Sequence, residues 1–301
     1  MNDQVWVAGE VLIDFIPGKS ESVVVVGGGP ANTAKSLSKL GIATYFIDGI
    51  STDIYGQMAK AELLSAHVFL DFAQFSNKPT CTAKVTLSNS GTASYEFVTD
   101  GTATFDFSSS WLPDPQSERP ALLHIGTLAT IIEPGALVLL KWAQNVAHFA
   151  PVVFDPNIRP AVLSDRDEYI NKIEKWVAIS SAIKVSDEDL NWLYPGKSID
   201  EIVNRWLEVG VQLVVVTFGD QGITAFREDE QISVEAVKVV VADTIGAGDT
   251  VGAVLVEAIV NNGLDNLTGE ALKAMLNRAA KAAAITVSRV GANPPSKAEL
   301  D

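Results

Sequence analysis

The segment VVVADTIGAGDTVGAVLVEAI, residues 239–259, decides the fold and indicates the chemistry. Its valines predict a strand that ends at Asp243, and a glycine-containing turn then leads into an apolar helix that opens near Gly246. The first N–H groups of a helix have no partner within the helix, and they lie at the positive end of the helix dipole. Such a turn is a typical anion site, because its amides can donate hydrogen bonds to a phosphate.

An acidic residue, Asp249, stands inside this predicted anion site. A carboxylate would repel a phosphate that is merely bound, so a simple phosphate-binding loop does not explain it. It suits phosphoryl transfer, in which the amides of Gly246, Ala247 and Gly248 stabilise the transferring group while Asp249 accepts the proton of the acceptor hydroxyl. The alternative is a capped helix start in which Asp249 interacts only with the helix dipole.

Outside this segment, apolar β-rich runs alternate with stretches of helical period. The runs are too continuously apolar for half-exposed strands, which indicates the buried strands of a mostly parallel sheet. Alternating strands and helices predict an α/β layered fold. Strands are expected at 5–9, 43–47, 121–126, 151–155, 182–185 and 212–219, and helices at 30–40, 54–65, 133–149, 167–178 and 199–209.

Two regions break this alternation. The runs at 11–17 and 22–26 predict one strand pair, and residues 81–98 predict a second pair that turns at Asn89–Ser90–Gly91. Four short strands without helices between them predict a small β-sheet beside the main sheet, placed to act as a lid. We therefore predict a single domain over residues 1–301, with a lid formed by about 11–27 and 80–99.

The composition excludes several classes of function. The 301 residues carry a net charge of −15, which repels phosphate backbones and anionic lipids and argues against nucleic-acid and membrane partners. One cysteine and three scattered histidines predict neither a disulfide framework nor a zinc site. No uncharged stretch approaches the roughly 18 residues of a membrane-spanning helix, and the first residues lack the features of a signal peptide. We expect a cytoplasmic protein.

Five motifs in order resemble the PfkB family of ribokinase-like carbohydrate kinases. The two family signatures are similar to DTIGAGD at 243–249 and GGGPANTAKSLSKLG at 27–41. Further similar segments are DPNIRP at 155–160, KVSDEDL at 184–190 and TFGDQG at 217–222. The resemblance runs from about residue 4 to 299, and GEVLIDFIP and DPNIRP look most like the fructokinase branch.

This resemblance implies both a fold and an activity. The fold would be a ribokinase-like three-layer αβα sandwich with a mostly parallel central sheet and a small β-sheet lid. The activity would be transfer of the γ-phosphoryl group of ATP, with Mg²⁺, to a primary hydroxyl of a small neutral sugar, foremost fructose. The family also leaves open a monovalent cation such as K⁺ near Asp243, and a homodimer through the open edges of the lid.

The resemblance also assigns roles to single residues, each with a structural alternative. Asp14 could be only an acidic strand end and Asn32 a polar residue of a helix turn, while residues 186–189 could be a helix cap and 217–222 a hairpin. The family roles are a catalytic base (Asp249) with an anion hole (Gly246, Ala247, Gly248), sugar binding (Asp14, Gly28, Asn32, Arg159) and nucleotide binding (Ser186, Asp189, Thr217, Gly219, Gly222).

Two departures from the family pattern affect the substrate and the metal. Ser186 and Asp189 stand where many members carry Asn and Glu, which puts direct metal contact in doubt. The lid segment FVTDGTAT at 97–104 has Asp100 near the place of the usual arginine and Thr104 near that of an aspartate, which favours neutral acceptors. Ketodeoxygluconate, ribose and nucleoside kinases remain alternatives, as does a non-catalytic sugar or nucleotide sensor, although the retained Asp249 favours an enzyme.

Overall fold

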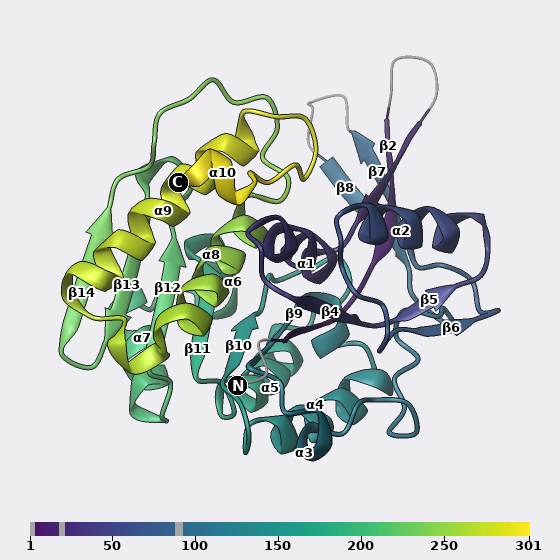
Figure 1. Cartoon of the computed structure of the whole chain (residues 1–301), viewed down its shortest axis with the longest axis horizontal. Helices are drawn as coiled ribbons and strands as arrows, with labels where there is room; N and C mark the ends of the chain where they lie inside the picture. Colours follow the sequence, from purple (N-terminus) through teal and green to yellow (C-terminus); the bar gives the residue numbers. More distant parts are fainter. Residues whose placement is uncertain (1–3, 18–21, 88–92) are drawn as a thin grey trace.

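A central sheet of eight strands organises the molecule (Figure 1). The computed structural model describes residues 4–17, 22–87 and 93–301. Six neighbouring strands pair in parallel and the last two antiparallel, which confirms the mostly parallel α/β sheet. In spatial order the strands are β14 (Glu230–Val234), β13 (Ile223–Arg227), β12 (Leu213–Thr217), β11 (Ala182–Ser186), β10 (Val152–Asp155), β9 (Leu122–Gly126), β1 (Val5–Ala8) and β4 (Thr44–Ile47).

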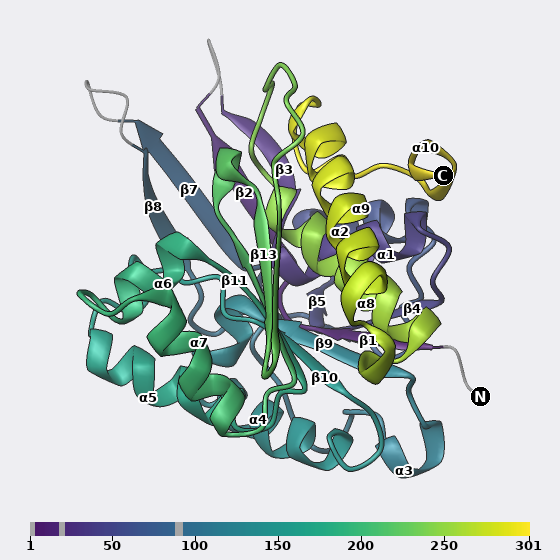
Figure 2. The same ribbon diagram turned by 90° about the vertical axis from the view of Figure 1, so that its left-hand side faces the viewer.

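Helices cover both faces of this sheet, so the molecule has three layers (Figure 2). The inner strands are buried on both faces: on β1, Trp6 and Ala8 belong to one hydrophobic cluster and Val5 and Val7 to the other. One face is covered by α1 (Gly29–Lys39), α2 (Ile54–Ser65), α8 (Ala247–Asn262) and α9 (Gly269–Val287), and the other by α4 (Gly135–Val146), α5 (Arg166–Val177), α6 (Asp187–Leu193) and α7 (Ile199–Glu208). Short helices are α3 (Pro115–Glu118), α10 (Lys297–Leu300) and the 3₁₀ turns η1 (Thr127–Thr130), η2 (Gly219–Gln221) and η3 (Leu264–Asn266).

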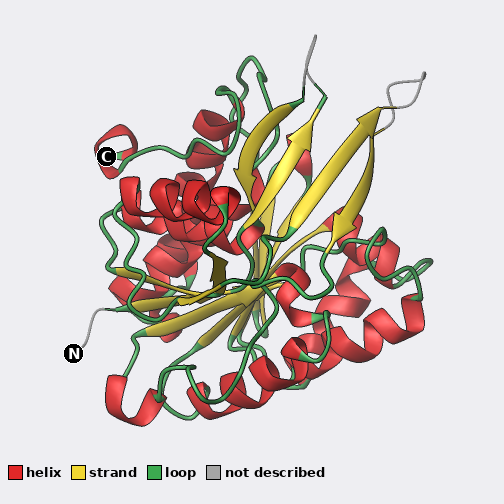
Figure 3. Cartoon of the chain, turned by 90° about the vertical axis from the view of Figure 1, so that its right-hand side faces the viewer, coloured by secondary structure: helices red, strands yellow, loops and turns green. Residues whose placement is uncertain are grey.

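A second sheet of four strands projects from one edge of the layers, and we call it the lid sheet (Figure 3). Its order is β3 (Val23–Gly27), β2 (Leu12–Ile16), β7 (Thr82–Leu87) and β8 (Ala93–Val98). This confirms the predicted four-stranded lid, although the turn predicted at Asn89–Ser90–Gly91 lies outside the described residues. Two further strands, β5 (Gly49–Ser51) and β6 (Gln74–Ser76), pair separately.

One predicted strand is wrong. Residues 239–243 form an irregular segment in which Val240 is 90% exposed. The backbone N–H groups of Ala242 and Asp243 donate to the carbonyl of Val287 at the end of α9, rather than to a neighbouring strand. Helix α9 itself is absent from the sequence expectations. Within the part of the chain that the structure describes, none of the helices combines the length and the apolar composition needed to cross a bilayer.

Candidate active site

The amino terminus of α8 lies at the carboxyl ends of the central strands. Gly246 immediately precedes the helix and has a φ of 79°, in the left-handed region that glycine adopts at little energetic cost. The first regular helical bond is donated by Thr250 to the Gly246 carbonyl, at 2.9 Å. The N–H groups of Gly248 and Asp249 have no acceptor among the described residues. Of the amides predicted for the anion hole, Ala247 donates its N–H to the Thr244 carbonyl at 3.4 Å, whereas Gly248, within the described part of the chain, keeps a free N–H at the helix terminus. Anion binding by these amides stays a prediction.

Asp249 is buried at this terminus, with only 8% of its surface exposed. Its Oδ2 accepts a 2.9 Å hydrogen bond from Asn32 Nδ2 of helix α1, and its other carboxylate oxygen has no partner among the described residues. Burial raises the pKa of Asp249 to about 6, against the opposing effect of the nearby Lys184 ammonium. The structure thus brings together two predicted residues, Asn32 and Asp249, that are 217 positions apart.

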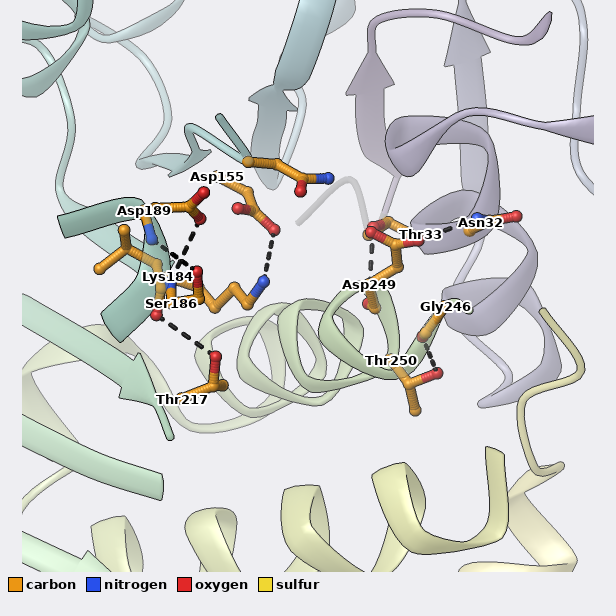
Figure 4. Close-up of polar contacts among 12 residues, drawn as sticks. Asn32, Thr33, Asp155, Lys184, Ser186, Asp189, Thr217, Gly246, Asp249 and Thr250 are labelled. Carbon is orange, nitrogen blue, oxygen red and sulfur yellow. Dashed lines mark hydrogen bonds and ion pairs between the residues drawn. The ribbon is translucent and has the colours of Figure 1, made fainter. Parts of the chain in front are cut away.

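A buried ion pair borders the other side of the helix terminus (Figure 4). Lys184 Nζ lies 3.0 Å from Asp155 Oδ2, and their side chains are 5% and 4% exposed. A Cβ atom on Gly248 would lie 2.7 Å from Lys184 Nζ, so the ammonium sits directly against the anion hole. Burial alone would lower the pKa of Lys184, but the carboxylates of Asp155 and Asp249 raise it above its usual value. The site thus joins a fixed positive charge to the free amides.

Ser186 and Asp189 form a helix cap at the start of α6. Ser186 Oγ accepts from the Asp189 N–H at 3.0 Å, and Asp189 Oδ2 accepts from the Ser186 N–H at 3.4 Å. The remaining oxygen, Asp189 Oδ1, accepts from the Ile158 N–H at 2.9 Å. The two residues therefore form the helix cap, and Asp189 additionally ties α6 to the loop after β10. Their role in nucleotide binding stays a prediction.

The predicted nucleotide residues of the 217–222 segment lie next to this cap. Thr217 ends β12 and pairs in register with Ser186 at the end of β11. Gly219 and Gly222 begin and follow the turn η2, with φ values of 55° and 118°. The segment after Thr217 connects β12 to its antiparallel neighbour β13, so it is the turn of a hairpin that lies beside the site.

The predicted sugar residues lie where the lid sheet meets α1. Asp14, on β2, packs so closely on Gly27 that a Cβ there would overlap its carboxylate, and Gly28 similarly abuts the carbonyl of Glu10. Burial raises the pKa of Asp14 to about 6, and the positive charge of Arg159 opposes that rise. Arg159 also lowers the pKa of Asp249, so its guanidinium lies within electrostatic range of both carboxylates.

The lid segment around Asp100 forms a turn, and the influence of Asp100 on the choice of acceptor stays a prediction. Asp100 is an exposed residue of a turn, where Thr102 Oγ1 donates to the Thr99 carbonyl at 2.7 Å. Thr104 is buried, and its hydroxyl donates to the Val11 carbonyl between the two sheets. A cation does lie near the carboxylates of Asp14 and Asp249: it is Arg159, from the loop after β10.

Asp243 holds a loop at the edge of the anion hole. Its Oδ1 accepts from the Ile245 N–H at 3.1 Å and its Oδ2 from the Gly291 N–H at 2.9 Å. Each oxygen therefore already accepts one backbone hydrogen bond. A monovalent ion beside Asp243 would have to share oxygens that already accept these bonds, and it stays a prediction.

Two residues of the candidate site, Lys184 and Asp155, were absent from the predicted site residues. The signal for Lys184 is a single charge within the apolar strand segment AIKVS, because a buried lysine requires a partner. Asp155 ends the neighbouring strand β10 and supplies that partner. Asp155 Oδ1 is buried without a hydrogen-bond partner among the described residues.

Comparison with known proteins gives consistent matches along the whole chain. Residues 2–299 match the model of the pfkB family carbohydrate kinases. A fructokinase of Rhizobium leguminosarum bv. trifolii is 33% identical over 264 residues, which cover 86% of this chain and 79% of that protein. Fructokinase-1 of Zea mays is 30% identical over 306 residues, covering 97% and 94%.

Solved structures share the fold. A fructokinase of Xylella fastidiosa with bound ATP superposes with a TM-score of 0.92 at 22% identity, covering 100% of this chain and 97% of that one. A double mutant of the Vibrio cholerae fructokinase, bound to fructose, ADP and a potassium ion, gives a TM-score of 0.88 at 24% identity, covering 99% and 97%. The predicted αβα sandwich with a β lid is confirmed.

Proposed function

The chain belongs to the pfkB family of carbohydrate kinases, and we propose that it is an ATP-dependent fructokinase. The observation that carries the proposal is the position of Asp249. Its carboxylate accepts a hydrogen bond from Asn32, one of the predicted sugar-binding residues, and lies at a free helix terminus that the Lys184 ammonium contacts. A group that can accept a proton and a site that can hold a phosphoryl group thus share one location.

The transfer follows from this geometry. The acceptor O–H bond breaks, its proton passes to Asp249 Oδ1, and the acceptor oxygen forms a bond to the γ-phosphorus. The bond from that phosphorus to the bridging oxygen breaks at the same time, and ADP leaves with the electron pair. The N–H groups of Gly248 and Asp249 offset charge on the transferring group, and Lys184 adds a positive charge that needs no rearrangement.

Asp249 suits the role of general base because of its environment. A pKa of about 6 leaves the carboxylate ionised at neutral pH, yet it is a stronger base than an exposed aspartate. Asn32 occupies Oδ2 and so fixes which oxygen faces the acceptor. The same burial restricts water, whose attack on ATP would be the competing reaction.

Magnesium would be held mainly by the nucleotide. The described residues contain no group of three acidic, histidine or cysteine side chains arranged to chelate a metal. The residue that fits is Asp155, whose Oδ1 is buried and unpartnered, since Mg²⁺ in kinases binds through one or two carboxylates together with phosphates and waters. When bound, the ion would neutralise charge on the β- and γ-phosphates. Asp189 fits less well, because both of its oxygens already accept backbone N–H bonds.

A neutral sugar is the acceptor that the charges favour. Asp14 can accept two hydroxyl hydrogen bonds, while Arg159 supplies a positive charge within electrostatic range of both Asp14 and Asp249. The carboxylates of Asp14, Asp155 and Asp249 outnumber the two nearby cations, Arg159 and Lys184, so an acceptor that brings a further negative charge would be disfavoured. Fructose fits this requirement, and it is the substrate named for the relatives that match most of the chain.

Three further features belong to the proposal. Residues 1–301 form a single kinase domain, with the lid formed by about 11–27 and 80–99. The outer strands of the lid sheet, β3 and β8, expose Val23 (53%) and Val98 (54%), which supports a homodimer through these edges. We also expect the enzyme to work in the cytoplasm.

A sugar panel tests the function. The purified protein is assayed with Mg·ATP in a coupled ADP assay against fructose, ribose, a nucleoside, ketodeoxygluconate and fructose 6-phosphate. We expect the highest kcat/KM for fructose, at least about 10-fold above the two anionic acceptors, which requires only ~1.4 kcal/mol. A preference for an anionic acceptor would refute the charge argument, and binding of sugar without turnover would indicate a sensor.

A further inference from the structure

Three polar atoms meet over Gly29, the first residue of α1. A Cβ atom added there would lie 2.8 Å from Thr127 Oγ1, 3.0 Å from Asn157 Nδ2 and 3.3 Å from Asp249 Oδ1. Because glycine carries only a hydrogen at this point, the hydroxyl, the amide and the carboxylate can all approach the same position. The free oxygen of the proposed base is therefore flanked by two residues that carry no role so far.

These two residues have an unusual backbone conformation. Thr127 has a φ of 59° and Asn157 a φ of 40°, values that are uncommon outside glycine and rare for a β-branched residue. Each follows a central strand, and the strand ends are neighbours: Gly126 of β9 pairs with Asp155 of β10. Left-handed residues at such positions are typical of functional sites, where the surrounding structure enforces the strain.

Hydrogen bonds to the backbone fix the conformation of both turns. Glu10, which is 1% exposed, accepts the Ala129 N–H at 3.1 Å, and Thr130 Oγ1 donates to the Thr127 carbonyl at 2.6 Å. On the other turn, Ile158 N–H donates to Asp189 Oδ1 at 2.9 Å. These bonds use backbone groups, so the side chains of Thr127 and Asn157 remain available.

Neither side chain has a hydrogen-bond partner within residues 4–17, 22–87 and 93–301, although Thr127 is only 5% exposed. A bound polyol would supply the missing partners, since a sugar hydroxyl can both donate and accept. On the basis of the proposed function, we infer that Thr127 and Asn157 are acceptor-binding residues, which orient sugar hydroxyls so that the reacting one meets Asp249 Oδ1.

Three variants test this assignment. Thr127→Val removes the hydroxyl at nearly constant volume, Asn157→Gly removes the amide and tolerates the left-handed backbone, and Thr127→Ser keeps the hydroxyl. The matched control is Thr44→Val. Thr44 is fully buried at the amino end of β4, away from the carboxyl ends of the strands where the site lies, and among the described residues its hydroxyl donates to the Ile42 carbonyl. The readouts are kcat/KM for the sugar, KM for ATP and the melting temperature.

We expect Thr127→Val and Asn157→Gly each to lower kcat/KM for the sugar at least about 10-fold, the loss typical of one removed hydrogen bond in a closed site. KM for ATP should stay within about twofold, and Thr127→Ser should keep most of the activity. Unchanged sugar kinetics in both variants would overturn the inference, as would equal losses for sugar and ATP. If Thr127→Val does not fold, Asn157→Gly and Thr127→Ser decide. The wild-type sugar panel tests the proposed function separately, because the variants are measured with whichever acceptor the wild type prefers.

Discussion

Replacing Asp249 by Asn should separate catalysis from stability, since the two change in opposite directions. The substitution removes the proton acceptor but keeps an oxygen for the Asn32 amide. We expect kcat to fall at least about 100-fold, the usual size for loss of a general base, with sugar and ATP binding largely retained. The folded protein should become more stable, because a buried ionised carboxylate is replaced by a neutral group.

The gain in stability can be worked from the pKa. Burial raises the pKa of Asp249 from its ordinary 3.8 to about 6. A shift of about two units corresponds to ~3 kcal/mol by which ionisation disfavours the folded state. This penalty is nearly absent below pH 4, grows as the pH rises from the ordinary pKa of 3.8 to the folded pKa of about 6, and is complete above that. The variant should therefore exceed the wild type by ~3 kcal/mol at pH 8 and by about half that at pH 5.

Thermal melts at the two pH values provide the assay. For a chain of this length, ~3 kcal/mol corresponds to a rise in Tm of roughly 5 °C. Asp265→Asn, at an exposed position in η3, is the matched control and should change neither Tm nor kcat. Turnover above half of the wild-type value would remove Asp249 from the proposed mechanism. A Tm difference that does not shrink from pH 8 to pH 5 would refute the electrostatic reasoning.

Three other outcomes follow from the same site. Asp14→Ala should cost about 2–4 kcal/mol in kcat/KM for the sugar through lost hydroxyl bonds, with KM for ATP nearly unchanged in the same titrations. The pH profile of kcat/KM should fall on the acid side of about pH 6, because Asp249 and Asp14 both have pKa values near 6 and act as ionised carboxylates; a flat profile from pH 5 to 8 would contradict this. Lys184→Met should destabilise the fold by about 3–5 kcal/mol in chemical denaturation, because it leaves Asp155 buried and unpaired. Adding Asp155→Asn should recover part of that loss, and failure to do so would mean that the pair is not the cause.

The sequence predicts the layers because burial imposes a pattern that the chain must carry. Continuous apolar runs mark strands covered on both faces, and the runs at β1 and β12 match the structure closely. The same rule fails at residues 239–243, where Val240 is exposed and the backbone bonds to the end of α9. Apolar composition cannot reveal whether a neighbouring strand is present. The composition of α9, rich in alanine and lysine, did carry a helical signal.

The residues of the candidate site also differ in how far the sequence predicts them. Asp249 is predictable, because a carboxylate at a glycine-rich helix start conflicts with simple phosphate binding and needs an explanation. The partner of Lys184 is not predictable from spacing alone, since Asp155 lies on another strand. The role inferred for Thr127 depends on the sign of its φ angle and on contacts with Gly29, and neither is encoded by a local pattern.

The bond between Asn32 and Asp249 also bears on the order of synthesis. It joins segments 217 residues apart, so the acceptor-side residues leave the ribosome long before the base that serves them. A nascent chain that ends before α8 lacks both the base and the free amides, and it can have no transferase activity. Long-range closure of this kind slows folding, because the entropy of the intervening chain is lost before the contact forms. Activity therefore requires a chain that has been synthesised at least through α8, and its appearance during translation would time the docking of α8 on α1.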